Sequence, residues 1–240
     1  AWLLAPWSAA AFAEVIQGTI TALDDVHALP TWVLSNHDVT RHPTRYGGGQ
    51  TGVARGRAAT LAMLALPGSA YLYQGEELGL EEVDVAPDDR QDPAWVRHLD
   101  GAFEGAPVHG TVGRDGCRVP IPWSGDQPPF GFGPGSGQPW LPQPPEWGTV
   151  SVAAQETDDA STLAFYRRAL AARREHAHGS DLLLTGLEAD DEVLRFRRGR
   201  LHVVLNAGAT AIPLPAGEVV LASGPLEADS LPPDTAVWLT

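Results

Sequence analysis

The chain has 240 residues, of which 43% are hydrophobic and 19% charged, a composition typical of a globular protein with a sizeable core. It carries 16 Lys and Arg against 30 Asp and Glu, so a formal net charge of -14 disfavours binding to nucleic acid and to anionic membrane surfaces. The longest apolar run, Ala58 to Leu66, is far shorter than the roughly 20 residues that a membrane-spanning helix needs.

The single cysteine and the first residues indicate the cellular compartment of the protein and the kind of boundary at which the chain starts. Cys117 excludes a disulfide within the chain and favours a reducing compartment, so we expect a cytoplasmic protein. Residues 1–7 have no initiator methionine and no basic flank, which is typical of a boundary inside a domain rather than of a targeting peptide. We therefore expect the chain to be part of a longer polypeptide.

The first predicted elements are a helix and a strand. The helix is capped by Ser8 and ends near Leu29, because apolar residues recur in it at every third or fourth position. Residues 31–35 form a β-branched and aromatic run without alternation, which is typical of a strand buried on both faces in a parallel sheet. A polar loop over 36–49 follows.

A second helix and a second strand come next. Apolar residues between Val53 and Ala65 form one helical stripe, and residues 70–73 predict another short buried strand that ends before Gly75. This alternation indicates βα units, in which the loops after the strands lie at the active face of a barrel.

The remainder divides into a long loop, a helix and a β-rich end. Residues 87–148 are rich in Pro, Gly and aromatic residues, and a loop of that length in a compact domain is usually functional. A last helix is expected from Ser161 to about His178. Turn residues then separate six predicted antiparallel strands, at 182–187, 193–196, 201–206, 211–214, 219–222 and 236–239. We place the boundary near Ser180, between domains 1–180 and 181–240.

The motif Leu34-Ser-Asn-His-Asp-Val-Thr-Arg41 follows the first predicted strand. Its place at the carboxyl end of that strand makes it a candidate substrate site in an α/β barrel. The residue types alone leave a second interpretation open, in which Asn-His-Asp is a turn whose side chains bind the backbone.

This motif carries a family resemblance. The stretch Trp32-Val-Leu-Ser-Asn-His-Asp38 resembles the fourth signature region of the α-amylase superfamily, especially that of bacterial α-glucosidases. The resemblance implies that His37 and Asp38 bind hydroxyl groups of the glucose whose bond is cleaved, and that Asp38 stabilises the oxocarbenium-like transition state. It also implies that Arg41 lies near the bound sugar, with a surface salt bridge as the alternative.

A second motif, Tyr71-Leu-Tyr-Gln-Gly-Glu-Glu-Leu-Gly79, resembles the last barrel strand of that family and the turn after it. Chemistry alone would allow Glu76 or Glu77 to pair with Asp38 as acid and nucleophile about 5 Å apart. We favour a structural role for both glutamates, because the resemblance implies that the catalytic carboxylates lie on earlier strands.

A third motif, Gly113-Arg-Asp-Gly-Cys-Arg-Val-Pro-Ile-Pro-Trp123, resembles the Arg-x-Pro-Met-Gln-Trp signature of α-glucosidases, with Ile121 and Pro122 in place of Met and Gln. The resemblance implies that Arg118 lines the mouth of the pocket. Aromatic residues of the following loop, among them Phe130 and Trp140, are expected to pack that loop onto the barrel, with stacking on sugars as the alternative.

Together these motifs predict an α/β chain, the C-terminal part of a (β/α)8 TIM barrel followed by a small antiparallel β-sandwich domain. The implied function is a retaining α-glucosidase whose nucleophile and acid/base precede Ala1, so the chain alone is expected to be inactive. The expected partners are a small oligosaccharide or disaccharide and the N-terminal remainder of the barrel. We expect no nucleic acid, membrane, cofactor or metal partner, since no two histidines have the helical spacing of a zinc site.

Two alternatives stay open. An α-glucosyltransferase, sucrose isomerase or trehalose synthase of the same superfamily would differ in how water and acceptor sugars compete for the glucosyl-enzyme intermediate. A non-catalytic scaffold relative would have lost the sugar-fixing residues, so His37 and Asp38 argue against it.

Overall fold

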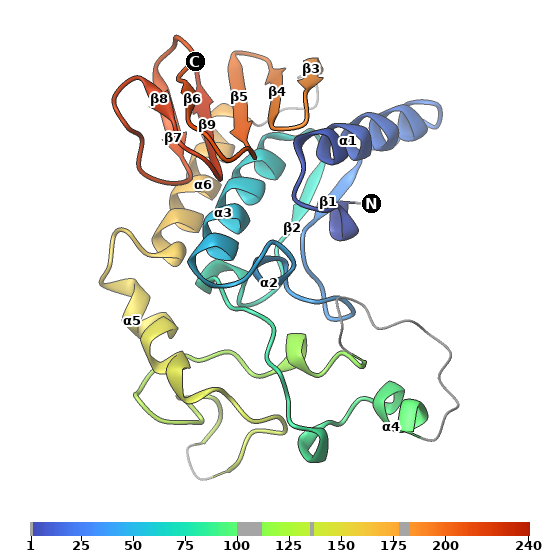
Figure 1. The fold of residues 1–240 in the computed structure, drawn as a ribbon, viewed down its shortest axis with the longest axis vertical. Helices are drawn as coiled ribbons and strands as arrows, with labels where there is room; N and C mark the ends of the chain where they lie inside the picture. Colours follow the sequence, from blue (N-terminus) through green and yellow to red (C-terminus); the bar gives the residue numbers. More distant parts are fainter. Residues whose placement is uncertain (1, 100–111, 135–136, 178–182) are drawn as a thin grey trace.

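A computed structural model describes residues 2–99, 112–134, 137–177 and 183–240. Figure 1 shows three levels along its long axis. An antiparallel sheet occupies one end, and long loops occupy the other. Between them lie a two-stranded parallel sheet and the helices α3 (Gly49–Ala65) and α6 (Thr162–His176), while α1 (Ala9–Asp24) lies beside the antiparallel sheet.

Helix α1 begins where the sequence predicts, because Ser8 Oγ accepts a hydrogen bond from the backbone N–H of Ala11 at 3.3 Å. The predicted end near Leu29 is wrong, since the helix stops at Asp24 and His27 takes a left-handed φ of 52°. Val26 and Leu29 are exposed, so no burial stabilises further helical turns.

Strands β1 (Thr31–Val33) and β2 (Ser69–Tyr71) pair in parallel with Trp32 opposite Ala70, which confirms the predicted βα arrangement. Burial on both faces is only partly confirmed. Trp32 is buried and its indole N–H donates to the carbonyl of Pro67, whereas Thr31 and Tyr71 are exposed. Tyr71 is 62% exposed because a sheet of two strands covers too little of its own surface.

Helix α3 is buried on all sides in its second half, where the sequence predicts a single apolar stripe. Every residue from Ala58 to Leu66 is buried, because α6 packs on one side and the C-terminal sheet on another. Two polar contacts join these layers: Thr60 Oγ1 lies 2.8 Å from the hydroxyl of Tyr166, and the indole N–H of Trp238 donates to the carbonyl of Leu61 at 3.0 Å.

Residues 76–156, which include the long segment 87–148, contain only short helices within the described ranges. These are α4 (Pro93–Leu99), α5 (Val152–Glu156) and 3₁₀ turns at Glu76–Leu78, Pro87–Asp89, Gly116–Arg118 and Pro145–Val150, besides α2 (His42–Arg45) and a 3₁₀ turn at Trp2–Leu4 nearer the N-terminus. Phe130 is buried in a separate core together with Trp147, which confirms the packing role expected for Phe130. Trp123, Phe132 and Trp140 are 48%, 41% and 53% exposed, so the packing role expected for Trp140 is wrong.

The C-terminal end is antiparallel, as predicted. One sheet has the order β3-β4-β5-β9-β7, formed by Leu184–Ala189, Val193–Arg198, Leu201–Asn206, Thr235–Leu239 and Val219–Ala222. A second, two-stranded sheet pairs β6 (Ile212–Pro213) with β8 (Ser230–Leu231). Strand β8 has only two residues and was too short to be predicted from the sequence pattern. Ser161 caps α6, which ends at His176, close to the predicted end at His178. His178 itself and the boundary near Ser180 lie outside the described residues.

None of the helices in these described ranges combines the length and the apolar character needed to cross a bilayer.

Candidate active site

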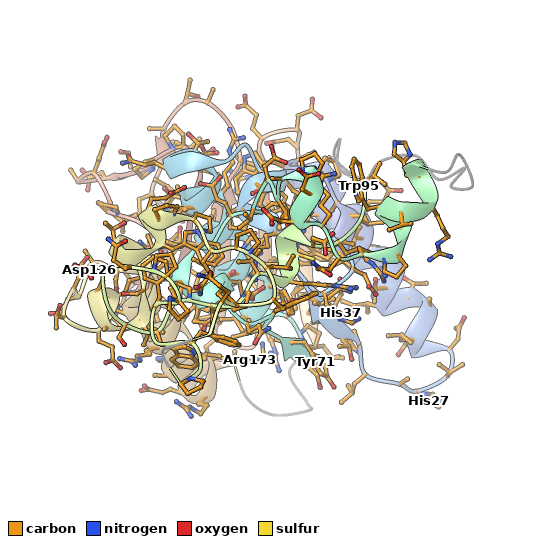
Figure 2. All side chains as sticks on the ribbon, turned by 90° about the horizontal axis from the view of Figure 1, so that it is seen from below. His27, His37, Tyr71, Trp95, Asp126 and Arg173 are labelled. Carbon is orange, nitrogen blue, oxygen red and sulfur yellow. The ribbon has the colours of Figure 1, made fainter. Side chains whose placement is uncertain are left out.

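The loop after β1, residues 34–41, presents Asp38 at the carboxyl end of the strand. Asn36 Oδ1 accepts a hydrogen bond from the backbone N–H of Asp38 at 2.8 Å, so Asn36 does form the turn that the sequence leaves open. The side chains of His37 and Asp38 are not used by that turn and are 67% and 46% exposed. His37 is labelled in Figure 2, which looks onto the loop end of the molecule.

Two arginines converge on one oxygen of Asp38. Arg118, at the end of the 3₁₀ turn Gly116–Arg118, donates from Nη2 to Asp38 Oδ1 at 3.1 Å and from Nε to the carbonyl of His37 at 2.8 Å. Arg114 donates from Nη1 to the same Oδ1 at 2.9 Å. The other oxygen, Oδ2, lies 3.4 Å from His37 Nε2. The structure therefore brings His37, Asp38 and Arg118 together.

These contacts fix the charge of Asp38. The hydrogen bond from Arg114 is the largest influence and lowers the pKa of the Asp38 carboxyl. Burial raises that pKa by less, and the nearby charges of His37, Arg114 and Arg118 lower it further. Asp38 is therefore ionised at neutral pH. An oriented carboxylate can accept hydrogen bonds from hydroxyl groups and stabilise positive charge that develops beside it.

Arg114 and Asp92 are functional candidates that the sequence reasoning missed. Asp92 has a fully buried side chain, and its Oδ2 atom accepts from Arg114 Nε at 2.6 Å. This hydrogen bond lowers the pKa of Asp92 to about 2. Arg114 could have been found in the sequence, because it lies within the third motif. No pattern in the sequence links Arg114 to Asp92.

Arg41 lies beneath the site. Its side chain is buried, donates from Nη1 to the carbonyl of Gln74 at 2.8 Å and from Nη2 to that of Cys117 at 3.0 Å, and stands over the ring of Tyr73. The alternative of a surface salt bridge is therefore wrong. These bonds tie the loop after β1 to the loop after β2 and to the Arg118 turn, while contact between Arg41 and a sugar stays a prediction.

Glu76 and Glu77 follow β2 in different environments. Glu76 is buried 3.7 Å from His42 Nδ1, and neither of its carboxylate oxygens has a well-formed hydrogen bond within the described residues. Burial raises its pKa to about 8, so the group is mostly protonated at pH 7 and poorly suited to act as a nucleophile. Glu77 Oε2 accepts from the backbone N–H of Gly75 at 2.8 Å. Both observations favour structural roles.

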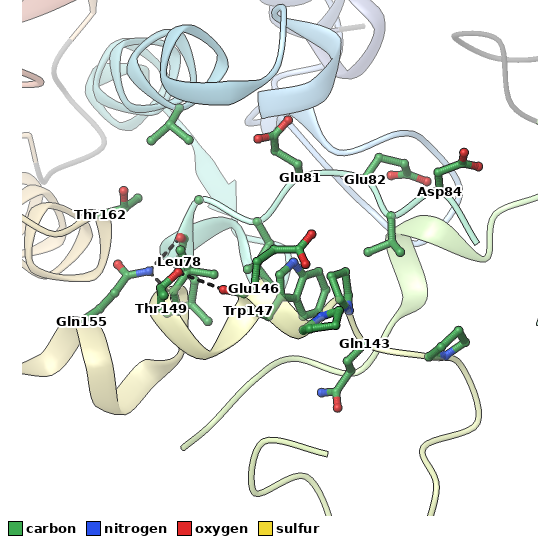
Figure 3. Close-up of a pocket in the computed structure, with 18 of the residues that line it drawn as sticks. Leu78, Glu81, Glu82, Asp84, Gln143, Glu146, Trp147, Thr149, Gln155 and Thr162 are labelled. Carbon is green, nitrogen blue, oxygen red and sulfur yellow. Dashed lines mark hydrogen bonds between the residues drawn. The ribbon is translucent and has the colours of Figure 1, made fainter. Parts of the chain in front are cut away.

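Hollows of different size lie near these loops. Figure 3 shows one of about 910 Å³, lined by residues that include Glu81, Glu146 and Trp147 and without His37 or Asp38. A smaller hollow of about 310 Å³ is lined by Arg118, Tyr73, Gln74, Pro120, Ile121, Phe132 and Trp140. Neither hollow is lined by His37 or Asp38, but the smaller one is linked to them through Arg118, which donates a hydrogen bond to Asp38 Oδ1. Within the described ranges, no three His, Cys, Asp or Glu side chains gather as metal ligands.

Comparison with known families divides the chain in two. Residues 1–181 match the family described as alpha amylase, catalytic domain, and residues 187–238 match one described as a domain of unknown function (DUF3459). A protein of Rhizobium meliloti named probable alpha-glucosidase is 40% identical over 144 residues, which make up 60% of this chain and 24% of that protein.

Solved structures give a similar result. An alpha-glucosyl transfer enzyme superimposes with a TM-score of 0.76 and 33% identity, over 99% of this chain and 45% of that one. The trehalulose synthase of Pseudomonas mesoacidophila has a TM-score of 0.80 over 97% of this chain and 46% of its own, and its 23% identity shows the fold alone. The chain spans between 24% and 36% of the length of the curated relatives it matches.

Proposed function

The chain belongs to the α-amylase catalytic-domain family, and on this basis we propose that it supplies the sugar-fixing half of a retaining α-glucosidase. Asp38 is the transition-state stabiliser, and His37, Arg41 and Arg118 are the substrate-binding residues. One observation carries the proposal: an ionised, half-exposed carboxylate stands at the carboxyl end of β1, held by two arginines beside an exposed histidine.

The geometry supports different roles for the two carboxylate oxygens of Asp38. Its Oδ1 atom is taken by Arg114 and Arg118, so Oδ2, next to His37, is the oxygen that accepts a hydrogen bond from a glucose hydroxyl. As the ring flattens toward an oxocarbenium ion, that hydrogen bond strengthens, and the fixed negative charge stabilises the developing positive charge.

The nucleophile and the acid/base are proposed to lie on other strands of the same barrel, outside the 240 residues. Two parallel strands cannot close a barrel, and the exposed face of Tyr71 on β2 fits a missing neighbour. The separate matches to residues 1–181 and 187–238 support a domain boundary near Ser180.

The proposed substrate is a small oligosaccharide or disaccharide, which places the protein in carbohydrate metabolism. A cytoplasmic location is proposed from the single Cys117, whose buried thiol has a pKa raised to about 12 and is therefore unreactive.

Glucosyl transfer is a second candidate, favoured by the similarity to an alpha-glucosyl transfer enzyme over 99% of the chain. The two activities share the glucosyl-enzyme intermediate and differ in whether water or a sugar accepts glucose. Product analysis of the complete protein with maltose separates them, because hydrolysis yields only free glucose and transfer yields new oligosaccharides.

The proposal is tested by comparing this chain with the complete product of its gene. We expect the complete protein to release nitrophenol from a nitrophenyl α-glucoside and the 240-residue chain to show no turnover. Turnover by the chain alone would overturn the assignment of the nucleophile and acid/base to other strands. Absence of turnover on every α-glucoside by the complete protein would overturn the glucosidase itself.

A further inference from the structure

The arginine that contacts Asp38 is itself held from behind. The carboxylate of Asp92 accepts three hydrogen bonds from Arg114: from Nε at 2.6 Å, from Nη2 at 3.1 Å and from the backbone N–H at 2.9 Å. Asp115 in turn accepts from the backbone N–H of Asp92 at 3.0 Å. A guanidinium bound along one edge by a buried carboxylate has a single orientation, and that orientation places Nη1 at Asp38 Oδ1.

We propose that Arg114, anchored by Asp92, is a positioning residue that fixes both the orientation and the charge of Asp38. This inference rests on the function proposed above for Asp38 and adds two residues to it. Arg118 and Arg114 then have different tasks. Arg118 binds the backbone of His37 as well as Asp38 and so holds the loop, whereas Arg114 holds only the carboxylate.

The arrangement requires an arginine. Three separate N–H groups of Arg114 are used at once, two toward Asp92 and one toward Asp38. A lysine at this position would keep the charge but, as a compact point charge on a flexible stem, could not span both carboxylates in one fixed geometry. Misplacing a group at a reaction centre by about 1 Å can lower the rate about 10²-fold. Loss of the guanidinium group that joins Asp92 to Asp38 is therefore expected to lower turnover.

The test uses the complete protein and compares kcat, KM and the pH profile of kcat/KM. Arg114→Lys is expected to lower kcat by about 10- to 10²-fold with a smaller change in KM. Asp92→Asn is expected to act in the same direction and less strongly. The double variant Arg114→Gln/Asp92→Asn removes both charges together, so no buried charge is left uncompensated and folding is preserved.

The pH profile distinguishes positioning from a merely structural role. The titratable and charged groups that face Asp38 within the described residues are His37, Arg114 and Arg118. Without Arg114, the pKa of Asp38 rises, so the acid limb of kcat/KM should move to higher pH in the double variant. The matched control is Asp234→Asn, which breaks the Arg55–Asp234 ion pair, in which no residue of the loop takes part, and should leave the profile unchanged.

Each of three results would overturn the inference. If the Arg114 and Asp92 variants behave like Asp234→Asn while Asp38→Asn is inactive, the positioning role is overturned and the proposed function stands. If the variants lose activity only in step with their melting temperature and the acid limb stays in place, the role is structural. If Asp38→Asn keeps full activity, the proposed function fails and the inference with it.

Discussion

Two carboxylates follow neighbouring strands of the same parallel sheet, yet the protein treats them in opposite ways. Asp38, after β1, is half-exposed and its pKa is lowered by the hydrogen bond from Arg114. Glu76, after β2, is buried and its pKa is raised to about 8 by loss of water. The difference is one of partners: well-placed guanidinium groups keep a carboxylate charged, whereas burial without them makes it neutral.

Of the two acids, only Asp38 is both charged and exposed enough to bind a substrate. Two arginines also lie near Glu76, but their N–H groups donate to backbone carbonyls instead. Arg41 donates to the carbonyls of Gln74 and Cys117. Arg45 donates to the carbonyls of Leu34 and Thr40. Asp38 is therefore the candidate for binding substrate, and Glu76 the candidate for shaping the interior of the barrel.

The sharpest way to break this comparison is to neutralise each acid in the complete protein. Asp38→Asn keeps the shape and removes the charge, so kcat should fall by about 10²- to 10³-fold. Glu76→Gln replaces a group that is already mostly neutral, so kcat should stay within a few-fold of the parent. Steady-state assays with a nitrophenyl α-glucoside measure both, and equal losses would contradict the distinction between them.

The raised pKa of Glu76 predicts that the stability of the fold depends on pH. The pKa of Glu76 is raised from its ordinary value of 4.5 to about 8, so its contribution is fully present below pH 4.5 and is lost as the pH rises toward 8. Between pH 4.5 and 7 the loss amounts to roughly 3 kcal/mol.

Glu76→Gln should therefore flatten the fall in melting temperature between pH 5 and 8 (about the limits set by the two pKa values). The exposed Glu14, changed to Gln, serves as a matched control and should leave the fall unchanged. Parallel melting curves for Glu76→Gln and the parent across this window would show that Glu76 is ionised in the fold.

The smallest expected effect concerns the turn that carries Asp38. Asn36→Ala removes the acceptor of the Asp38 backbone N–H, a single hydrogen bond worth about 1 kcal/mol. We expect a stability loss of that size in denaturant unfolding and a several-fold loss in kcat, because Arg114 and Arg118 still hold the carboxylate. A loss of kcat as large as that of Asp38→Asn would mean that the turn, not the arginines, orients Asp38.

Local signals in the sequence predicted much of the fold. The hydroxyls of Ser8 and Ser161 cap helices where expected, and the short apolar runs at Thr31 and Ala70 pair as parallel strands. The helix end at Leu29 could not be predicted, since apolar periodicity continues through Val26 although that side chain is 66% exposed. Periodicity reports what a segment could bury, and only its neighbours decide what it does bury.

For the site, the sequence by itself determined the family and the motifs that bear His37, Asp38 and Arg118, because those residues are local to strand-end loops. Only the tertiary structure decided that Arg41 lies in the interior, that burial raises the pKa of Glu76, and that Asp92 holds Arg114 against Asp38. The physical reason is that charge and orientation depend on burial and on partners distant in the chain. Asp38 and Arg114 are 76 positions apart, and their contact exists only once the fold has brought both loops to one end of the sheet.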